Sequence, residues 1–596
     1  MVERRALSTS LSIRAITRAE DKLVFVFGAM EGTAKETKAQ RVERLKRAKN
    51  PWECFGEIER FAREGYASIP PEWLSTYFRW WGIYTQGDGR GALGGTGGEG
   101  KAVPYFMVRI RLPNGLLFSH QLRTIATLAE KYACGVADLT VRQNIQLHWV
   151  TIEALPELMR ELWRCGLTTM AACGDDTRNI TGCPLTGVDA DEICDASPLV
   201  LQATRLLVGN PEFYNLPRKY KISITGCRVW CSYPEINDIG MTAIARTRNG
   251  PPEMGFSLRV GGGLSTDPHL GVRLNAFVQW NQVVPVIKGI TEIFRDSEIL
   301  RQSRERARLK FLFKSHGWTA ESFQAELERR LRFRLDPAVP EDPPVDVYRD
   351  HIGIHAQKQE GYRYVGAAVL RGRITPGQMR AAADLADRFA CGELRTTNMQ
   401  NLLIVNVPQQ NAEPLAKELD AVGLRVAASP FWRGAIACTG TEFCKLAITE
   451  TKSFARWVVE DLEERLPGFD QELKLHITGC PNSCGQHWIA DIGIEGKKRK
   501  VEGQMVDAYY FCVGGAVGKH QAIARPIGYR CPANEVPQAI ERLLRVYLAT
   551  RLPGENLRQF FARHTDTELR AFLAGAQVEA VARDPSPGQR PHGVEG

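Results

Sequence analysis

The sequence lacks the features that mark membrane proteins and secreted proteins. No stretch of its 596 residues approaches the twenty consecutive apolar residues that a transmembrane helix needs, so we expect no membrane partner. The first residues, Met-Val-Glu-Arg-Arg-Ala-Leu-Ser, contain no apolar run of signal-peptide length. We therefore expect a cytoplasmic protein, with a transit peptide as the alternative that the Ser and Arg content leaves open.

Signals for nucleotide and nucleic-acid binding are also missing. No Gly-x-Gly-x-x-Gly fingerprint lies between a strand and a helix, and the glycine-rich segment 87–100 leads into a strand, so we interpret it as a loop. No Lys/Arg tract alternates with aromatic residues, and no zinc-finger or helix-turn-helix spacing occurs, so we expect no nucleic-acid partner. The net charge of +9 favours acidic partners or polyanionic ligands, although a solvated basic surface explains it equally well.

Cysteine, in contrast, is plentiful. Fifteen cysteines in a chain this long indicate reduced thiols, some of them bound to metal, and not a disulfide framework. Cys438 and Cys444 form one close pair, and Cys480 and Cys484 form a second. Two short loops that each carry two thiolates can hold a four-iron cluster. Zinc is the alternative, but zinc pairs usually leave two to four residues between ligands and the first pair leaves five, so we predict a cluster.

Hydrophobic periodicity predicts a mixed α and β protein. Apolar and polar residues alternate over Phe106–Leu112, which predicts a half-buried strand. A helix over His120–Cys134, a strand over Ile145–Val150 and a helix over Leu155–Cys165 complete the unit. A strand, helix, strand, helix order is typical of α+β or mixed α/β domains.

The same unit recurs later in the chain. Ala129-Glu-Lys-Tyr-Ala-Cys134 is echoed by Ala386-Asp-Arg-Phe-Ala-Cys391, and Thr225-Gly-Cys227 is echoed by Thr478-Gly-Cys480 at an offset only four residues shorter. We therefore predict two homologous halves related by a pseudo-twofold axis, with a ligand between them. The predicted domains are a helical N-terminal lead-in (1–100), a first half (101–340), a second half (341–550) and a C-terminal extension (551–596) with a disordered end.

The repeat also places Cys183, Cys227 and Cys231 opposite three of the four cluster cysteines, with Asp189 at the position of the fourth. The favoured interpretation is that they are small buried side chains that remain from a duplication. A second metal site with Asp189 as the fourth ligand is the alternative. Because basic residues lie near these positions, we expect the first half to face an anion and the second half to hold the electron-carrying cluster.

Together these motifs resemble a known family. The cysteine pairs, the duplication, Arg142-Gln-Asn144 followed by His148, and Leu216-Pro-Arg-Lys-Tyr-Lys221 resemble the sirohaem-dependent assimilatory sulfite and nitrite reductases, in particular the bacterial ferredoxin-dependent, single-chain type. The resemblance runs from about Pro51 to about Phe560. It implies a duplicated fold around a sirohaem cleft and a 4Fe-4S cluster coupled to sirohaem. It also implies a six-electron reduction of sulfite to sulfide or of nitrite to ammonia.

The resemblance also implies roles for individual residues. Sirohaem carries eight carboxylates, so its pocket must supply many cations and polar contacts. The candidate sirohaem contacts are Arg142, Gln143, Asn144, His148, Arg218, Arg306, Arg308, Lys310 and Asn482. The candidate anion-binding residues on the open side of the haem are Arg109, Arg178, Lys219 and Lys221. The implied cluster ligands are Cys438, Cys444, Cys480 and Cys484, the last of which would bridge the cluster and the haem iron. A solvated or structural role remains open for each sirohaem contact taken alone.

Lys219 and Lys221 support this interpretation independently of the family. Two residues apart on a predicted strand, they would point the same way, and such a like-charge pair is costly unless an anion lies between them. A lysine beside other cations has a lowered pKa, which helps it to donate a proton. Sulfite reductases of the family tend to have lysine at the position of Lys221 and nitrite reductases asparagine, so we predict a sulfite reductase, with nitrite reductase as the alternative.

The electrons must come from another protein, because the sequence has no nucleotide fingerprint and no length left for a flavin domain. A basic chain suits ferredoxin or a similar acidic carrier. We expect a monomer. A rival hypothesis from another class is a non-catalytic iron-sulfur or zinc scaffold.

Overall fold

The structure is a computed structural model that describes residues 36–92, 99–247, 250–340, 344–347 and 349–575. The expectations about a leader segment and about the disordered end fall on residues outside these ranges. The chain divides into the units Met1–Thr37 and Lys38–Gly596, and the second unit is described below. Among the described residues, no helix has both the length and the apolar character needed to cross a membrane.

In the described part of the chain, three α-helices precede the first sheet. They are α1 (Lys38–Ala48), α2 (Phe55–Glu64) and α3 (Pro71–Ser75). Ile58 and Phe61, three positions apart on α2, are fully buried, as the spacing of the apolar residues predicts. Trp73 and Trp80 are also buried and pack in the same core as the first two sheets.

The first two sheets each contain a strand from the other half of the chain. Sheet one has the order β1 (Ile83–Gly87), β2 (Ala102–Ile110), β5 (Ile145–Val150), β4 (Ala137–Leu139) and β12 (Arg373–Ile374). Sheet two has the order β10 (Gly353–Ala356), β11 (Tyr362–Ala367), β14 (Leu402–Pro408), β13 (Glu393–Thr396) and β3 (Leu116–Phe118). The second half thus supplies β12 to sheet one, and the first half supplies β3 to sheet two. This reciprocal exchange is what a pseudo-twofold relation of two repeats produces.

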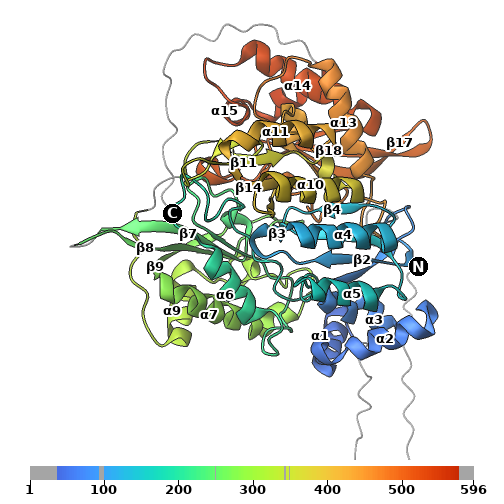
Figure 1. Cartoon of the computed structure of the whole chain (residues 1–596), viewed down its shortest axis with the longest axis vertical. Helices are drawn as coiled ribbons and strands as arrows, with labels where there is room; N and C mark the ends of the chain where they lie inside the picture. The colour runs from blue at the N-terminus through green and yellow to red at the C-terminus, as the bar shows by residue number, and fades with distance from the viewer. Residues whose placement is uncertain (1–35, 93–98, 248–249, 341–343, 348, 576–596) are drawn as a thin grey trace, which may run out of the picture. The chain divides into compact units, whose positions relative to one another are not determined.

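Matching helices cover these sheets. They are α4 (Ser119–Tyr132) and α5 (Leu155–Arg164) in the first half and α10 (Pro376–Phe389) and α11 (Gln409–Ala421) in the second. On α4 the buried residues include Leu122, Ile125, Ala126 and Ala129, and α10 buries Met379, Ala382, Ala383 and Ala386 at the same spacing. The small alanines let the two helices pack side by side, where Figure 1 shows them in blue and yellow. Residues of both halves therefore share one hydrophobic core.

A third and a fourth sheet follow the shared core in each half. Sheet three consists of β6 (Ile222–Thr225), β7 (Ile239–Arg246), β8 (Glu253–Val260) and β9 (Val272–Gln279). It packs with α6 (Ser197–Leu207), α7 (Val283–Arg295), α8 (Lys310–Ser315) and α9 (Ala320–Leu331). Sheet four consists of β15 (Ala435–Ala437), β16 (Leu475–Thr478), β17 (Ile492–Val501), β18 (Gln504–Val513) and β19 (Arg525–Pro532).

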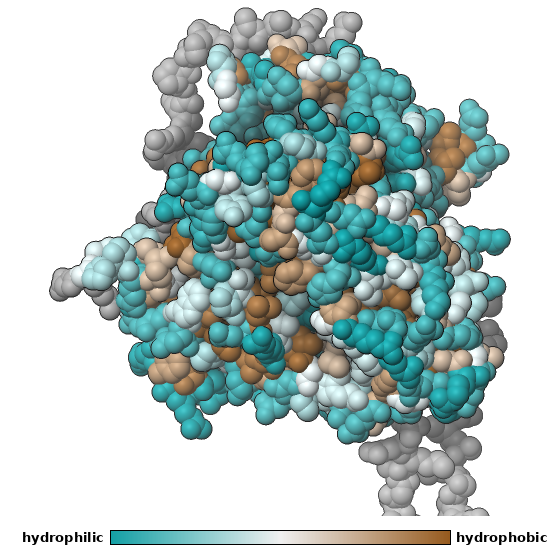
Figure 2. All heavy atoms as spheres, viewed as in Figure 1, coloured by the Kyte–Doolittle hydropathy of each residue, from teal (hydrophilic) through white to brown (hydrophobic). Residues whose placement is uncertain are grey.

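The helices around sheet four extend beyond the predicted end of the second half. They are α12 (Pro430–Gly434), α13 (Lys452–Arg465), α14 (Val536–Thr550), α15 (Leu557–Arg563) and α16 (Asp566–Ala574). Phe560 on α15 and Leu569 on α16 are fully buried in the core of sheet four. The first residues of the expected C-terminal extension are therefore part of this core, while the boundary at residue 550 stays a prediction. Over the face seen in Figure 2, polar residues predominate and apolar residues form scattered groups.

Hydrogen bonds repeat between the halves as the strands do. The side-chain oxygen of Thr140 accepts from the amide nitrogen of Asn144 at 3.1 Å, and Thr397 accepts from Asn401 at the same distance. Within the two loops, Gln143 donates to the carbonyl of Thr396 at 3.2 Å, and Gln400 donates to the carbonyl of Leu139 at 2.9 Å. Each glutamine therefore joins its own half to the other.

We predict that Gln143→Leu destabilises the protein. Its buried amide also donates to the carbonyls of Asn114 and Gly182, and leucine would leave these acceptors unpaired. The free energy of unfolding should fall by about 1 to 3 kcal/mol, measured by urea denaturation. Gln302→Leu, at an exposed position, is the matched control. Equal unfolding midpoints for the two variants would show that Gln143 does not hold the halves together.

Candidate active site

The four cysteines predicted to bind the cluster lie at one edge of sheet four. Cys438 follows β15 and Cys480 follows β16, and these two strands are parallel neighbours. Because parallel strands end at the same edge of a sheet, both loops reach the same place. The backbone nitrogen of Cys438 donates to the carbonyl of Ile477 at 3.1 Å, which fixes one loop against the other strand.

The thiols are electrostatic neighbours and accept hydrogen bonds. Burial and the neighbouring Cys484 raise the pKa of Cys444 to about 12, and the same two causes raise the pKa values of Cys438 and Cys480. The backbone nitrogen of Gly479 donates to Cys438 Sγ at 3.2 Å. Asn482 Nδ2, expected as a cofactor contact, donates to Cys480 Sγ at 3.5 Å. Thiols that resist ionisation in this way need bound metal to become thiolates.

The five residues between Cys438 and Cys444 separate these two thiols more widely along the chain than the ligands of a usual zinc pair. Sulfurs around one tetrahedral zinc ion lie about 3.8 Å apart. Among the described residues, the groups of three or more possible ligands that lie within 4.8 Å of one another do not include these four thiols. The set therefore fits a multi-iron cluster, which the family implies, better than a zinc ion.

His148 of the first half packs against the loop between Cys438 and Cys444. The His148 ring stacks on Phe443 with 4.2 Å between ring centroids. Its Nε2 lies 3.1 Å from Asp138 Oδ2, and burial lowers the pKa of His148. Asp138 also pairs with Arg373 of the second half at 2.9 Å. His148 thus supports the cluster loop, and its predicted contact with sirohaem stays a prediction.

Buried cations gather on the side of the first half that faces these loops. Tyr220 is fully buried, with its ring stacked on Phe294, so Lys219 and Lys221 lie on the opposite face of the extended segment. Burial, Arg218 and Arg308 lower the pKa of Lys219 to about 7, whereas the neighbouring Cys484 acts in the opposite direction. The cluster edge of one half is therefore within electrostatic reach of the cations of the other.

The same charge crowding acts on Lys221. Burial, Arg142 and Arg308 hold the pKa of Lys221 well below its usual range. Arg308 is paired with Asp238, with 2.8 Å between Nη2 and Oδ2, and Asp238 also accepts from the backbone nitrogen of Lys221 at 2.8 Å. Asp238 alone cannot neutralise the two lysines together with Arg142 and Arg308. The residues present therefore fit a polyanionic group such as a carboxylate-rich tetrapyrrole together with an oxyanion substrate.

Arg109 and Arg178 both donate hydrogen bonds to one turn of the first half. Arg109 Nη1 donates to the carbonyl of Ala172 at 3.1 Å and to Cys173 Sγ at 3.0 Å. Arg178 Nη2 donates to the carbonyl of Gly174 at 3.0 Å and to the Tyr84 hydroxyl at 3.2 Å. Both guanidinium groups therefore reach the turn at residues 172–174.

The remaining predicted sirohaem contacts have different surroundings. Arg142 Nη1 donates to Asn237 Oδ1 at 2.8 Å, Arg218 pairs with Asp175 at 3.3 Å, and Lys310 Nζ donates to the carbonyl of Leu264 at 3.1 Å. The side chains of Gln143 and Asn144 are buried and bonded to backbone groups. Arg306 is exposed. A contact of any of these residues with the cofactor stays a prediction.

The sequence analysis did not identify two acidic residues of the site, although one of them recurs in the repeat. Asp238 pairs with Arg308, and Asp138 pairs with His148 and Arg373. Asp238-Ile-Gly240 recurs as Asp491-Ile-Gly493, and Asp491 Oδ2 accepts from the backbone nitrogen of Lys474 as Asp238 does from Lys221. The repeated Asp therefore holds the start of a parallel strand in both halves.

Comparisons with known proteins agree with this geometry. Residues 173–335 and 429–574 match the Nitrite and sulphite reductase 4Fe-4S domain, and residues 99–164 and 355–422 match the Nitrite/Sulfite reductase ferredoxin-like half domain. The assimilatory ferredoxin-dependent nitrite reductase of Haloferax mediterranei is 37% identical over 535 residues, covering 85% of this chain and 88% of the relative. Sulfite reductase (ferredoxin) 1 of Mycolicibacterium paratuberculosis is 36% identical over 539 residues, covering 89% and 95%.

A solved structure extends the likeness to the fold. The Mycobacterium tuberculosis NirA protein matches with a TM-score of 0.83 at 35% sequence identity, covering 89% of this chain and 97% of that one. These findings confirm the duplicated mixed fold, the enzyme class and the two cofactors that the sequence predicts. The chain belongs to the nitrite and sulfite reductase family, whose members are oxidoreductases that carry sirohaem and a 4Fe-4S cluster.

Proposed function

We propose that the protein is a ferredoxin-dependent assimilatory sulfite reductase, which reduces sulfite to sulfide with six electrons. The observation that carries the proposal is the half-buried pair Lys219 and Lys221 on one face of an extended segment, because a divalent oxyanion neutralises such a pair better than a monovalent one. Lysine at position 221 is also the residue expected in sulfite reductases of the family. Relatives named ferredoxin-dependent sulfite reductases support the proposal.

Nitrite reductase is the second candidate for the same site. A relative from Leptolyngbya laminosa that is named ferredoxin–nitrite reductase is 34% identical over 523 residues. Nitrite is also a small oxyanion, and the cations that would bind sulfite can bind it too. The two candidates differ in charge and shape of the substrate and not in the class of reaction.

The chain's own residues would hold the two cofactors from opposite sides. Cys438, Cys444, Cys480 and Cys484 would ligate the cluster, and Arg142, Arg218, Arg308 and Lys310 are the cations that would pair with the carboxylates of sirohaem. When bound, sirohaem and cluster supply electrons one at a time and an iron atom at which the anion can be reduced.

The substrate would be bound by four cations of the first half, which are Arg109, Arg178, Lys219 and Lys221. One of them, Lys219, would also supply protons. Arg109 and Arg178 would hold the oxyanion through paired N–H donors. Lys219, whose pKa is lowered to about 7, can transfer a proton from Nζ to a departing oxygen and then take up another from solvent. Each oxygen that leaves sulfite as water needs two protons, so a group that titrates near neutrality suits this role.

Ferredoxin or a similar acidic carrier is the proposed electron donor. The net charge of +9 supports docking of an acidic protein, and several relatives carry ferredoxin in their names. A monomeric state and a cytoplasmic location remain predictions from the sequence.

Replacement of Lys221 tests the substrate assignment. We expect Lys221→Asn to lower kcat/KM for sulfite about tenfold more than kcat/KM for nitrite, because the variant loses charge that a divalent anion needs more. The measurement is steady-state reduction of each anion with reduced ferredoxin. Lys417→Asn, at an exposed position on α11, is the control and should change neither value. Equal losses with the two anions would count against sulfite as the preferred substrate.

The lowered pKa of Lys219 predicts a pH dependence. Below its pKa the amine is charged and binds anions, and above it this attraction is lost, so KM for nitrite should rise with pH from about 7 upward. Nitrite is the better probe because its own charge stays constant in this range. Carboxylates of the cofactor would shift the change to higher pH. Lys219→Arg should remove the rise, since arginine stays protonated. A KM that rises equally in both proteins would assign the titration to another group.

A further inference from the structure

Three cysteines of the first half meet a histidine in the buried space between the halves. The ligand atoms of Cys183, Cys231 and His351 all lie within 4.8 Å of one another, and so do those of Cys183, Cys227 and Asp189. The Sγ atoms of Cys227 and Cys231 are 3.7 Å apart. Each of the three sulfurs is therefore close to the other two, and His351 reaches two of them.

These distances fit a single metal ion and not a cluster. Sulfurs bound to one tetrahedral zinc ion at about 2.3 Å lie about 3.8 Å from each other. The observed 3.7 Å between Cys227 and Cys231 matches this value. The site thus differs in kind from the loops of sheet four, although the repeat places the cysteines opposite one another.

His351 is suited to bind a metal ion. Its side chain is 4% exposed, and neither ring nitrogen has a hydrogen-bond partner among the residues that the structure describes. A buried imidazole without a partner is unfavourable, and a bound ion would remove that cost. Asp189, the fourth ligand considered from the sequence, is already paired with Arg349 at 2.8 Å. The free imidazole is therefore the better fourth ligand.

The loops that carry the thiols are held in place around them. Backbone nitrogens of Leu185 and Val229 donate to Cys183 Sγ at 3.4 Å and to Cys227 Sγ at 3.3 Å. Amide donors to sulfur are a feature of metal-thiolate sites because they stabilise the charged ligand. Leu403 and Val405 of β14 pack against the cysteines and contribute to an apolar surrounding.

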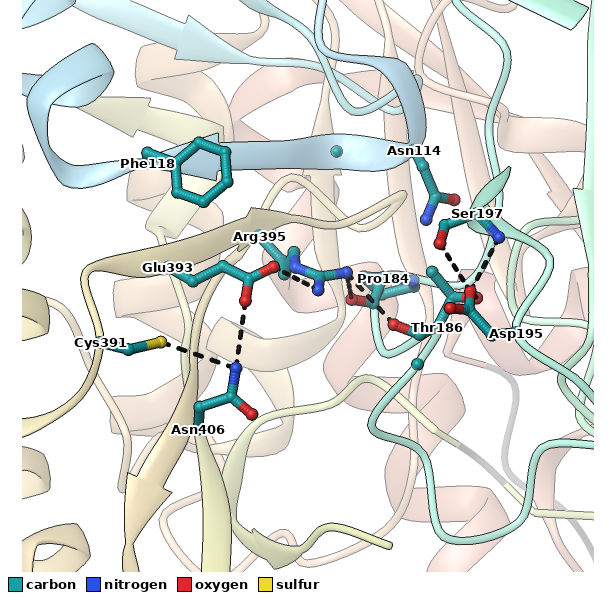
Figure 3. Close-up of polar contacts among 12 residues, drawn as sticks. Asn114, Phe118, Pro184, Thr186, Asp195, Ser197, Cys391, Glu393, Arg395 and Asn406 are labelled. Carbon is teal, nitrogen blue, oxygen red and sulfur yellow. Dashed lines mark hydrogen bonds and ion pairs between the residues drawn. The ribbon is translucent and has the colours of Figure 1, made fainter. Parts of the chain in front are cut away.

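The second half fixes the Cys183 loop from outside. Figure 3 shows Arg395 of β13 reaching the carbonyls of Pro184 and Thr186, at 3.3 and 3.4 Å. The Thr186 hydroxyl donates to Asp195 at 2.9 Å, which anchors the other side of the loop. Such support holds Cys183 in place before any metal binds.

We propose that Cys183, Cys227, Cys231 and His351 form a structural zinc site. Binding would release the protons of the three thiols and leave His351 neutral. Two loops of the first half would then be joined to the start of the second half, since His351 lies just before β10. The proposal goes beyond the reductase activity and does not depend on which anion is reduced.

Metal analysis and X-ray absorption at the zinc edge test the proposal. The full-length protein, purified from zinc-supplemented cells and treated with a chelator to remove loosely bound ions, should hold about one zinc ion per chain. The absorption data should show three sulfurs at about 2.3 Å and one nitrogen at about 2.0 Å. Iron in the two cofactors does not contribute to this signal, and the reading needs no enzyme activity.

Variants identify the ligands. Cys227→Ser and His351→Ala should each reduce zinc from about one to about zero per chain while iron content stays unchanged. Cys531→Ser removes a buried cysteine of β19 outside the site and should keep the zinc. Wild-type protein without zinc, or zinc retained in both Cys227→Ser and His351→Ala, would overturn the proposal. If the variants fail to fold, the zinc-edge spectrum of the wild-type protein decides, because any coordination other than three sulfurs and one nitrogen contradicts it.

Discussion

Buried positive charge is the constraint on which the active site depends. Lys219 and Lys221 lie half-buried near the buried Arg308, and Asp238 balances only part of their charge. Such an arrangement is unfavourable in the empty protein, because burial disfavours charged amines and the cations repel one another. An anion with several charges reverses both effects. The carboxylates of sirohaem and a bound oxyanion explain why a protein would keep these residues together.

The duplicated fold explains why the cations of the first half lie near the thiols of the second half. The exchange of β3 and β12 ties the first two sheets into one core, so the third and fourth sheets are held against it in matching ways. In both halves, parallel strands deliver cysteine loops to a sheet edge. In the second half the family implies that the thiols hold a cluster, whereas in the first half they are close enough for one ion. The same scaffold thus supports two kinds of metal chemistry.

Local patterns in the sequence predicted much of this architecture. The strand at Ile145–Val150 and the helix that begins at Leu155 have the predicted bounds or nearly so, because periodicity is set by residues close in the chain. Repetition predicted the duplication, and the spacing of Cys438 to Cys484 predicted the cluster. The strand exchange was not predictable, since pairing between distant segments leaves no local pattern. His351 was missed for the same reason, because its approach to the cysteines of the first half is a contact between segments far apart in the chain.

The burial of long basic side chains also could not be predicted from the sequence. Arg306 and Arg308 are two residues apart in a basic run, yet Arg306 is exposed and Arg308 is buried against Asp238. Composition and spacing cannot distinguish them, because the difference arises from a turn that packs one residue inward. The family resemblance carried both into the predicted site, and the structure separates them by burial.

The absorption spectrum of the purified protein, before and after addition of sulfite, tests the central claim most directly. If the cations of the first half and the thiols of the second hold sirohaem against a cluster, the protein should show a Soret band and a long-wavelength band, and sulfite should shift both. A protein that contains iron and sulfide but shows neither haem band would contradict the account, because the buried cations would then have no polyanion to bind.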